Sequence, residues 1–376
     1  MRLRTCIALE LLFGAATLTS FGVGAVWGAG RLFDYVLVRE GVAVAATAEV
    51  PAPAPAPLSR IAPARLEISA LPPPRAELAP PPAPTLTVFG APDDELLAPL
   101  RDAPLVKAKV NGGGTTLSLR LDFEGGARAA FKPEQVFSQS NPRREIAAYR
   151  LDRLLGLGRV APAFARRFTV DELVAVLGPT GGQAVREQAI ARGGVIAGEL
   201  SWWIPTIVDA HIGGFPIDAT DGIVTWRRLL KAGADRTALS DADRELVRQI
   251  SDMVLFDFVT DNIDRWSGAN AKASPDGRVL YYMDNTMSFS TNPGGHVRSY
   301  TYLKRVETFS RHVVDRLRAL DADQLRAAMA AGPEEPLGAL LTAEELGALL
   351  TRRDAALAYI DDLIAKHGEE AVLGFP

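Results

Sequence analysis

The chain has 376 residues, of which 48% are hydrophobic and 23% are charged, enough for a folded protein with a sizeable core and one large or two smaller domains. Its net charge of -4 and the lack of a strongly basic run argue against nucleic acid as a partner. A single cysteine, Cys6, excludes an intramolecular disulfide, and no zinc-type spacing of Cys and His is present.

The N-terminal segment carries the first predicted element. From Leu11 to Gly30 the chain has 20 residues without a charge, about the length of a membrane-spanning helix. A cleaved signal peptide is the alternative, although its apolar core is usually only ~7–15 residues long. We therefore expect residues 1–30 to form an uncleaved anchor, a single N-terminal helix that holds the protein at a membrane. Arginines flank the segment on both sides, so the side of the membrane on which the rest of the chain lies is left open.

An alanine- and proline-rich stretch follows, and we assign residues 31–94 to it as a linker. Twelve of the 26 prolines fall between Pro51 and Pro84. Because proline fixes φ and removes an amide donor, helix and sheet are both disfavoured, and the composition is typical of an extended spacer. A proline-rich ligand for a partner protein is the alternative. The remaining residues, 95–376, are predicted to form one folded domain.

That domain begins with three strand-like segments, residues 105–110, 115–123 and 128–133. The first two are separated by "NGGG" and the second pair by "EGG". Alternating patterns joined by glycine-rich turns predict an antiparallel meander. The "NGGG" turn is equally compatible with a loop that holds phosphate groups.

Mainly helical patterns follow the strands. Residues 143–158 show helical spacing that Gly156 is placed to end, and residues 194–208 are predicted as strands or a connecting segment. A second helix is expected from Ser240 to Phe258, opened by Ser240 with Asp243 three residues later. A "SPDG" turn, a strand over 278–285 and helices from Val306 onward complete the pattern. The order predicts an α+β fold with a small antiparallel sheet followed by a mainly helical region.

The segment "DFVTDNIDRWSGAN", residues 257–270, ends the second helix and concentrates acidic and amide side chains. One interpretation is a surface turn in which Asx side chains bond to their own backbone. The other is a catalytic loop that carries a carboxylate and metal ligands.

The order of four residues along the chain favours the catalytic interpretation. Phosphoryl transfer needs a lysine on a sheet, an acid on a nearby helix, a carboxylate for the acceptor hydroxyl and another for a metal ion. Lys132 ends a predicted strand, and Glu145 lies 13 residues later in the first turns of a helix. Asp264 follows the second helix, and Asp284 ends a strand 20 residues after it. Each residue alone has an ordinary structural explanation, but their joint order predicts a kinase-like site.

At these residues the chain resembles a known family. The stretches "RAAFKPEQ", "REIAAYRLDRLLGLGRVAP", "DFVTDNIDRW" and "YYMDNTMSF" resemble the four-jointed, Golgi casein kinase and glycan xylose kinase family of secretory-pathway kinases. The resemblance covers residues 105–289, and "NxDR" is more distantly similar to the catalytic loop of phosphoinositide kinases. It implies a two-lobed atypical protein-kinase-like fold, in a divergent member that we expect to be bacterial.

The resemblance also implies roles for individual residues. Lys132 would contact the nucleotide phosphates, and Glu145 would pair with Lys132 or help to hold a metal. Asp264 would be the catalytic base and Asp284 a metal ligand, while Asn262 would brace the loop. The implied substrates are ATP, with Mg²⁺ or Mn²⁺, and a hydroxyl group of a protein or glycan acceptor.

Several departures from the family pattern leave a second hypothesis open. Trp266 replaces the histidine that usually follows the Asp-Arg pair. Kinases generally place a second metal ligand five residues after the catalytic aspartate, where this chain has alanine, so we predict Asn270 as that ligand. Asn285 is followed by Thr286 where the family often has glycine. A pseudokinase that binds a nucleotide or a partner without turnover is therefore the alternative function.

The remaining candidates are aromatic residues and histidines. Trp202 and Trp203 are compatible with an adenine pocket, but large aromatic residues more often belong to the core, which is the interpretation we favour. The four histidines have no metal-ligand spacing and are interpreted as structural or surface residues.

Overall fold

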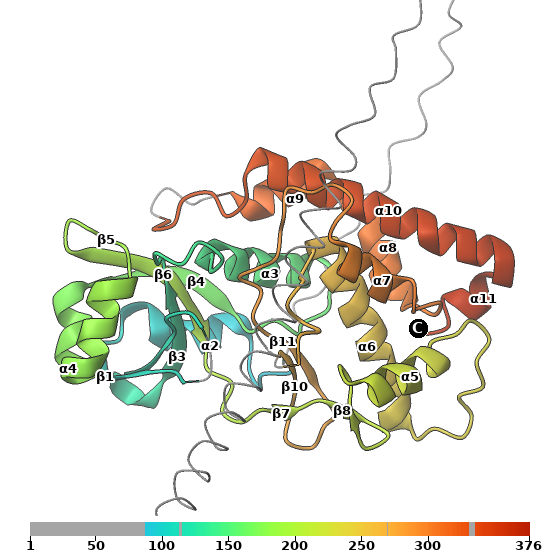
Figure 1. Ribbon diagram of the computed structural model, residues 1–376, viewed down its shortest axis with the longest axis horizontal. Coiled ribbons are helices and arrows are strands. Elements are labelled where there is room, and N and C mark those ends of the chain that lie inside the picture. Colours follow the sequence, from blue (N-terminus) through green and yellow to red (C-terminus); the bar gives the residue numbers. More distant parts are fainter. Residues whose placement is uncertain (1–86, 113–114, 269, 331–334) are drawn as a thin grey trace, which may run out of the picture. The chain divides into compact units, whose positions relative to one another are not determined.

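The computed structural model describes residues 87–112, 115–268, 270–330 and 335–376 (Figure 1). Within these ranges, no helix combines the length and the apolar character that crossing a membrane requires. The predicted localisation, at a membrane through a single N-terminal helix, is therefore contradicted. The segment 11–30 that prompted it, like most of the predicted linker, lies outside the described residues.

The first lobe is built on an antiparallel sheet with the strand order β1-β2-β3-β6-β4. The three predicted strands are confirmed, the second one shortened. Between β2 and β3, Gly125 and Gly126 adopt φ values of 81° and 88°, which explains the "EGG" turn. The strands of this sheet are β1 (Leu105–Val110), β2 (Leu119–Phe123), β3 (Arg128–Pro133), β4 (Ala163–Thr169), β6 (Val195–Trp202) and, paired with β6, β5 (Ala191–Arg192).

The two faces of this sheet differ in the size of their side chains. One face carries Phe131, Phe168 and Leu200, which form a core with helices α2 (Asp93–Asp102) and α4 (Val170–Gln188). The other face carries small residues, among them Ala165 and Ala197, which belong to the larger core of the molecule. Because these side chains are small, helix α3 (Pro142–Leu154) can pack closely over β4 and β6. Successive strand residues alternate between faces, so Lys132 lies on the α3 side.

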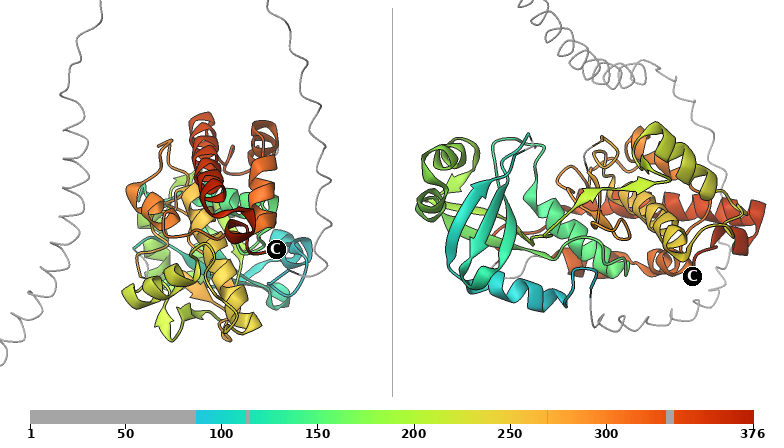
Figure 2. Two further views of the ribbon diagram at one scale, coloured as in Figure 1. Left: turned by 90° about the vertical axis from the view of Figure 1, so that its right-hand side faces the viewer. Right: turned by 90° about the horizontal axis from the view of Figure 1, so that it is seen from below.

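The second lobe surrounds the buried helix α6 (Asp241–Thr260), which begins as predicted with Ser240 accepting a hydrogen bond from the Asp243 amide. Seen from below, the sheet lobe lies to the left and the helical lobe to the right (Figure 2). The other helices of the second lobe are α5 (Thr220–Leu229), α7 (Val297–Leu303), α8 (Arg311–Ala319), α9 (Ala322–Met329), α10 (Ala343–His367) and α11 (Glu369–Val372). Its short strands are β7 (Val208–Asp209), β8 (His211–Ile212), β9 (Phe215–Pro216), β10 (Ala271–Ala273) and β11 (Leu280–Tyr282).

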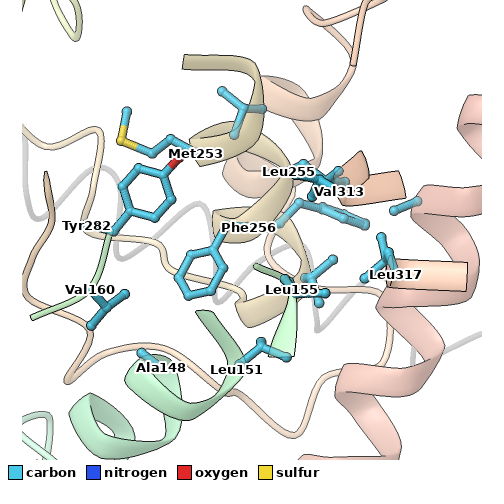
Figure 3. Close-up of a cluster of buried hydrophobic side chains, with 14 of the residues drawn as sticks. Ala148, Leu151, Leu155, Val160, Met253, Leu255, Phe256, Tyr282, Val313 and Leu317 are labelled. Atoms are coloured by element: carbon cyan, nitrogen blue, oxygen red, sulfur yellow. The ribbon is translucent and has the colours of Figure 1, made fainter. Parts of the chain in front are cut away.

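Helix α3 joins the two lobes through a shared core. Ala148 and Leu151 of α3 lie beside Phe256 of α6 and Tyr282 of β11 in one buried cluster (Figure 3). Gly156, with φ of 70°, follows the end of α3 as the sequence predicts. The predicted α+β, two-lobed arrangement is confirmed. Helix α3 packs against both lobes and so connects the sheet to the helical lobe.

Two features of the fold differ from the sequence prediction. Helix α4 was not expected, because "LGPTGG" within it contains residues that usually end helices; the helix accommodates them with a kink at Gly178, whose φ is 71°. The strand predicted over 278–285 is confined to Leu280–Tyr282. The chain after Tyr282 leaves the sheet and forms a loop, which frees Asp284 from strand pairing.

We predict that the close approach of β6 to β3 depends on Gly198. A Cβ at this position would lie 2.6 Å from the Lys132 carbonyl oxygen and 2.6 Å from the Phe131 ring. Gly198→Ala should therefore lower the free energy of unfolding by ~1–3 kcal/mol. Gly347→Ala on the exposed side of α10, where a Cβ meets nothing within 4 Å, should raise it by ~0.5–1 kcal/mol. Chemical denaturation of the two variants checks both values, and a neutral Gly198→Ala would contradict the packing described.

Candidate functional site

Lys132 stands at the centre of the candidate site. Its Nζ donates hydrogen bonds to Glu145 Oε1 at 2.5 Å and to Asp284 Oδ1 at 2.9 Å. Burial alone would lower the pKa of Lys132, but the carboxylates of Asp284, Glu145 and Glu199 raise it above its usual range. The ammonium group is therefore charged, and it connects β3, α3 and the loop after β11 directly. Three of the predicted site residues, Lys132, Glu145 and Asp284, are therefore in direct contact.

The start of α3 fixes Glu145. Asn141 caps the helix by accepting a hydrogen bond from the Arg143 amide, and Pro142 occupies the first turn. Glu145 follows in that turn and is buried. Its second oxygen, Oε2, accepts a hydrogen bond from Asn285 Nδ2 at 3.1 Å. Both oxygens of this carboxylate therefore accept hydrogen bonds, one from Lys132 in β3 and one from Asn285 in the loop after β11.

The loop after β11 presents Asp284 to solvent. Asp284 has a positive φ of 56°, and its side chain is 42% exposed although it is bonded to Lys132. The Lys132 ammonium lowers the pKa of this carboxyl, and the Thr286 hydroxyl donates to its Oδ1 at 3.1 Å. The group is ionised and accessible, which suits it to bind a cation.

Asp261 ends α6 and organises a different segment. It adopts φ of 56° as the C-cap residue of the helix. Its carboxylate accepts hydrogen bonds from the His296 amide at 2.8 Å, the Ser299 hydroxyl at 3.0 Å and the Ser290 hydroxyl at 2.5 Å. Asp261 therefore ends the helix with a turn, and its side chain also holds the chain between residues 290 and 299.

Asn262 joins the loop of Asp264 to the loop of Asp284. Its Oδ1 accepts from the Asp264 amide at 3.1 Å, and its Nδ2 donates to the Asp284 carbonyl at 3.2 Å. The same Nδ2 donates to Asn285 Oδ1 at 3.2 Å. The two aspartates therefore stand on adjacent loops, and Asn262 braces them as the resemblance implied.

Asn270 lies against the predicted base. Its Nδ2 donates to Asp264 Oδ2 at 2.7 Å and to the Asp264 carbonyl at 3.3 Å. Among the described residues no hydrogen bond joins Asn270 to Asp284. The structure thus brings Asn270 to Asp264 and orients that carboxylate, while its assignment as a metal ligand stays a prediction.

Arg265 is a fully buried residue of the site that the sequence analysis did not single out. It donates to Asp257 Oδ1 at 3.3 Å, to Asn285 Oδ1 at 2.9 Å and to the Met283 carbonyl. Burial outweighs Arg265 and raises the pKa of Asp257 to about 6. The guanidinium thereby connects the loop that carries Arg265 to α6 and to the loop after β11. Its neighbour Trp266, where the family has histidine, stacks on Tyr302 with ring centroids 4.5 Å apart.

A pocket of about 180 Å³ opens beside Lys132. Trp202 and Trp203 both line it, and Trp202 also packs against the hydrophobic clusters of the sheet lobe and of Phe89, as the preferred interpretation of a core residue expects. The signal for this pocket was the pair of tryptophans at the end of an apolar strand, followed by Ile-Pro. The other lining residues are Ala130, Lys132, Glu145, Val160, Ala161, Ala163, Glu199, Ser201, Ile204, Pro205, Ile207, Tyr282, Met283 and Asp284. The pocket is apolar along one wall and charged at the Lys132 end.

Glu199 is a second residue that sequence reasoning missed. It lies in β6 opposite Lys132 in β3, is 2% exposed and lines the pocket. Burial, reinforced by Glu145, raises the pKa of its carboxyl to about 8 despite the opposing effect of Lys132. The signal in the sequence was a glutamate inside the otherwise apolar run "GVIAGELSWW".

The charges at this end of the pocket are suited to a divalent cation. Three carboxyl groups, Glu145, Glu199 and Asp284, surround one ammonium group. In the described residues no group of three or more His, Cys, Asp or Glu side chains has metal-binding geometry. Carboxylate oxygens are nevertheless the donors that Mg²⁺ and Mn²⁺ prefer, and Asp284 offers them from an accessible position. The chemistry of the Asp284 carboxylate thus fits the predicted metal.

Comparisons with known proteins agree with this geometry, although no family model matches the chain. The chain is 26% identical over 329 residues to a glycosaminoglycan xylosylkinase of Danio rerio, covering 74% of this chain and 76% of the relative. It is 30% identical over 205 residues to four-jointed box protein 1 of Mus musculus, covering 52% of this chain and 41% of that protein. These relatives support the family that the motifs resemble and a kinase-type phosphotransferase. The expected bacterial origin stays a prediction.

Solved structures establish the fold. A structure of the Golgi casein kinase superimposes with a TM-score of 0.56 at 15% identity, covering 75% of this chain and 79% of the other. Another structure of the Golgi casein kinase has Mn/ADP bound and superimposes with a TM-score of 0.55. The structure of hydra Fam20 with sugar gives a TM-score of 0.55 at 20% identity, covering 73% and 90%. The predicted atypical kinase-like fold is confirmed.

We predict a pH-dependent stability that arises from Glu199. Its pKa rises from the ordinary 4.5 to about 8 on folding, so the folded state binds a proton that the unfolded state has lost between these pH values. The wild type should therefore lose stability as pH rises from about 4.5 to about 8, and Glu199→Gln should lack this contribution. The variant should gain ~2–5 kcal/mol relative to wild type over that interval, without metal or nucleotide. Denaturant titrations at several pH values measure the difference, and a constant difference between the two proteins would contradict the burial of an ionisable Glu199.

Proposed function

We propose that the chain is an ATP-dependent phosphotransferase that transfers the γ-phosphoryl group to a hydroxyl of a protein or glycan, as a divergent member of the four-jointed, Golgi casein kinase and glycan xylose kinase family. One observation carries the proposal: Lys132 bonds to Glu145 and Asp284 at once, and Asn262 ties the loop of Asp264 to that of Asp284. This assembly provides the parts that phosphoryl transfer requires, within one connected network.

The pocket provides the nucleotide site in this proposal. Its apolar wall of Trp203, Ile204 and Pro205 suits a purine base, and its charged end suits phosphates. Lys132 would hold the phosphates, with Glu145 keeping the lysine in place from α3. Relatives described as Mn/ADP-bound and as xylosylkinases are consistent with nucleotide and divalent metal use.

Asp264 and Asp284 have separate roles in the proposed reaction. Asp264 would accept the proton of the acceptor hydroxyl, and the amide of Asn270 on its Oδ2 orients the carboxylate for that task. Asp284, with Asn270 as the predicted second ligand, would hold Mg²⁺ or Mn²⁺, which neutralises developing charge on the phosphates. Because the reacting groups are held by a rigid network, positioning and electrostatics would supply most of the rate.

The proposed acceptor classes follow from the names of the relatives. One group is named for a glycosaminoglycan xylose, and the structural neighbours for casein. A sugar or a protein hydroxyl is therefore the proposed acceptor. We propose residues 95–376 as the catalytic domain, preceded by a short flank in which Phe89 stacks on Tyr281 with ring centroids 5.8 Å apart.

The test is transfer of labelled γ-phosphate from ATP by the full-length protein, with Mg²⁺ or Mn²⁺ and with protein and glycan acceptors. Asp264→Asn should reduce transfer ~10²–10⁴-fold, the effect of losing a positioned base, with little change in ATP affinity. Asp284→Asn should weaken metal-dependent ATP binding as well as transfer.

The control for these variants is Asp276→Asn. Asp276 lies in the exposed "SPDG" turn, bonded to Ser274 and to the Arg278 amide, away from the pocket. It is a better control than Asp261, whose carboxylate holds the segment 290–299. Full transfer by Asp264→Asn, in a folded protein, would remove Asp264 from the mechanism. ATP binding without transfer to any acceptor by wild type would favour the pseudokinase alternative.

A further inference from the structure

The ion pair between Lys132 and Asp284 raises a question about the proposed function, on which this inference rests. In the structure Lys132 Nζ donates to Asp284 Oδ1 at 2.9 Å. The same carboxylate is the one that the proposed function assigns to a cation. A divalent cation on this carboxylate repels the adjacent ammonium group and competes with it for the negative charge of Asp284, so cation binding weakens the bond from Lys132 to Asp284. Lys132 would then keep only Glu145 as a carboxylate partner, and a largely buried charge with fewer partners is less favourable, so a second acceptor would stabilise it.

Glu199 is placed to provide that replacement. Its register position in β6 is directly opposite Lys132 in β3, and side chains of directly opposed residues lie on the same face of a sheet. Glu199 is 2% exposed, and its Oε2 has no hydrogen-bond partner among the described residues. A buried carboxyl oxygen without a partner, adjacent to a lysine and facing a pocket, is an available acceptor.

The electrostatic state of Glu199 agrees with this placement. A carboxyl that is firmly paired with an ammonium group ordinarily has a lowered pKa. In Glu199 burial and Glu145 outweigh Lys132 and raise the pKa to about 8. The charge of Lys132 therefore lowers the pKa of Glu199 in part, but the hydrogen bonds that Lys132 donates go to Glu145 and Asp284. A closer approach of the ammonium group would favour the ionised form of Glu199.

We propose that Glu199 is a positioning residue that accepts a hydrogen bond from Lys132 when a divalent cation takes Asp284. Lys132 keeps its bond to Glu145 throughout and exchanges Asp284 for Glu199. The exchange releases Asp284 to the cation while the ammonium group keeps two carboxylate partners, Glu145 and Glu199. Glu199 acts through Lys132 and does not itself bind the cation.

A double-mutant cycle tests this coupling with Mn²⁺ alone as the probe. The affinity of the full-length protein for Mn²⁺ is measured in wild type, Glu199→Met, Lys132→Met and the double variant. In wild type, Glu199→Met should weaken Mn²⁺ binding about 10-fold, the effect of losing a hydrogen bond to a charged group. In the Lys132→Met background Asp284 is already free, so adding Glu199→Met should change the affinity less than about 2-fold.

Two variants keep the test independent of folding and of general charge effects. Glu199→Gln retains an oxygen acceptor and should lose less Mn²⁺ affinity than Glu199→Met; it also serves if Glu199→Met does not fold, as judged by thermal unfolding. Glu134→Gln removes a carboxylate that pairs with Arg192 outside the pocket and should leave Mn²⁺ affinity unchanged.

The outcomes separate this inference from the proposed function. Equal losses in both backgrounds would make Glu199 a direct contributor to cation binding, and no loss in either would remove it from the site; both results overturn the exchange. A wild type that binds no Mn²⁺ overturns it as well, together with the proposed metal site. Mn²⁺ binding with the expected coupling but without phosphoryl transfer supports the exchange and rejects the proposed function.

Discussion

The site depends on one buried cation, the ammonium group of Lys132, and on the carboxylates that hold it. Desolvation of a charge is costly, and here Glu145 and Asp284 offset that cost with direct bonds. Glu145 belongs to α3 and Asp284 to the loop after β11. Their bonds to Lys132 therefore hold β3 of the sheet lobe against α3 and against that loop. The Asp284 side chain is partly exposed, so a ligand can reach this group of charges from the solvent.

A second set of buried polar groups positions the reacting carboxylates. Asn285 receives hydrogen bonds from Asn262 and Arg265 on one atom and donates from another to Glu145. Through Asn262 this network continues to the backbone of Asp264. A fully bonded polar network inside a protein is rigid, because each member loses a partner if another moves. The loop of Asp264 is therefore held by side chains rather than by secondary structure.

The sequence predicted those parts of the fold and site that depend on local pattern. The first three strands, the N-terminal cap of α6 and the order of Lys132 and Glu145 could be inferred from turns, spacing and residue type. Glu199 could not, because its meaning depends on the register of β6 against β3, which brings together residues distant in sequence. Arg265 has the same difficulty, since a buried arginine cannot be told from an exposed one before its partners are known. The membrane localisation was inferred from residues outside the described part of the chain, and the described part offers no spanning helix.

If Lys132 and its carboxylate partners form a phosphate and metal site, a crystal structure with Mn²⁺ and a non-hydrolysable ATP analogue should show both ligands there. We expect the base against Trp203, a phosphate oxygen within hydrogen-bonding distance of Lys132 Nζ, and Mn²⁺ on the carboxylate of Asp284. A nucleotide bound elsewhere, or one bound in the pocket while Lys132 remains paired with Asp284 and no metal contacts that carboxylate, would contradict it.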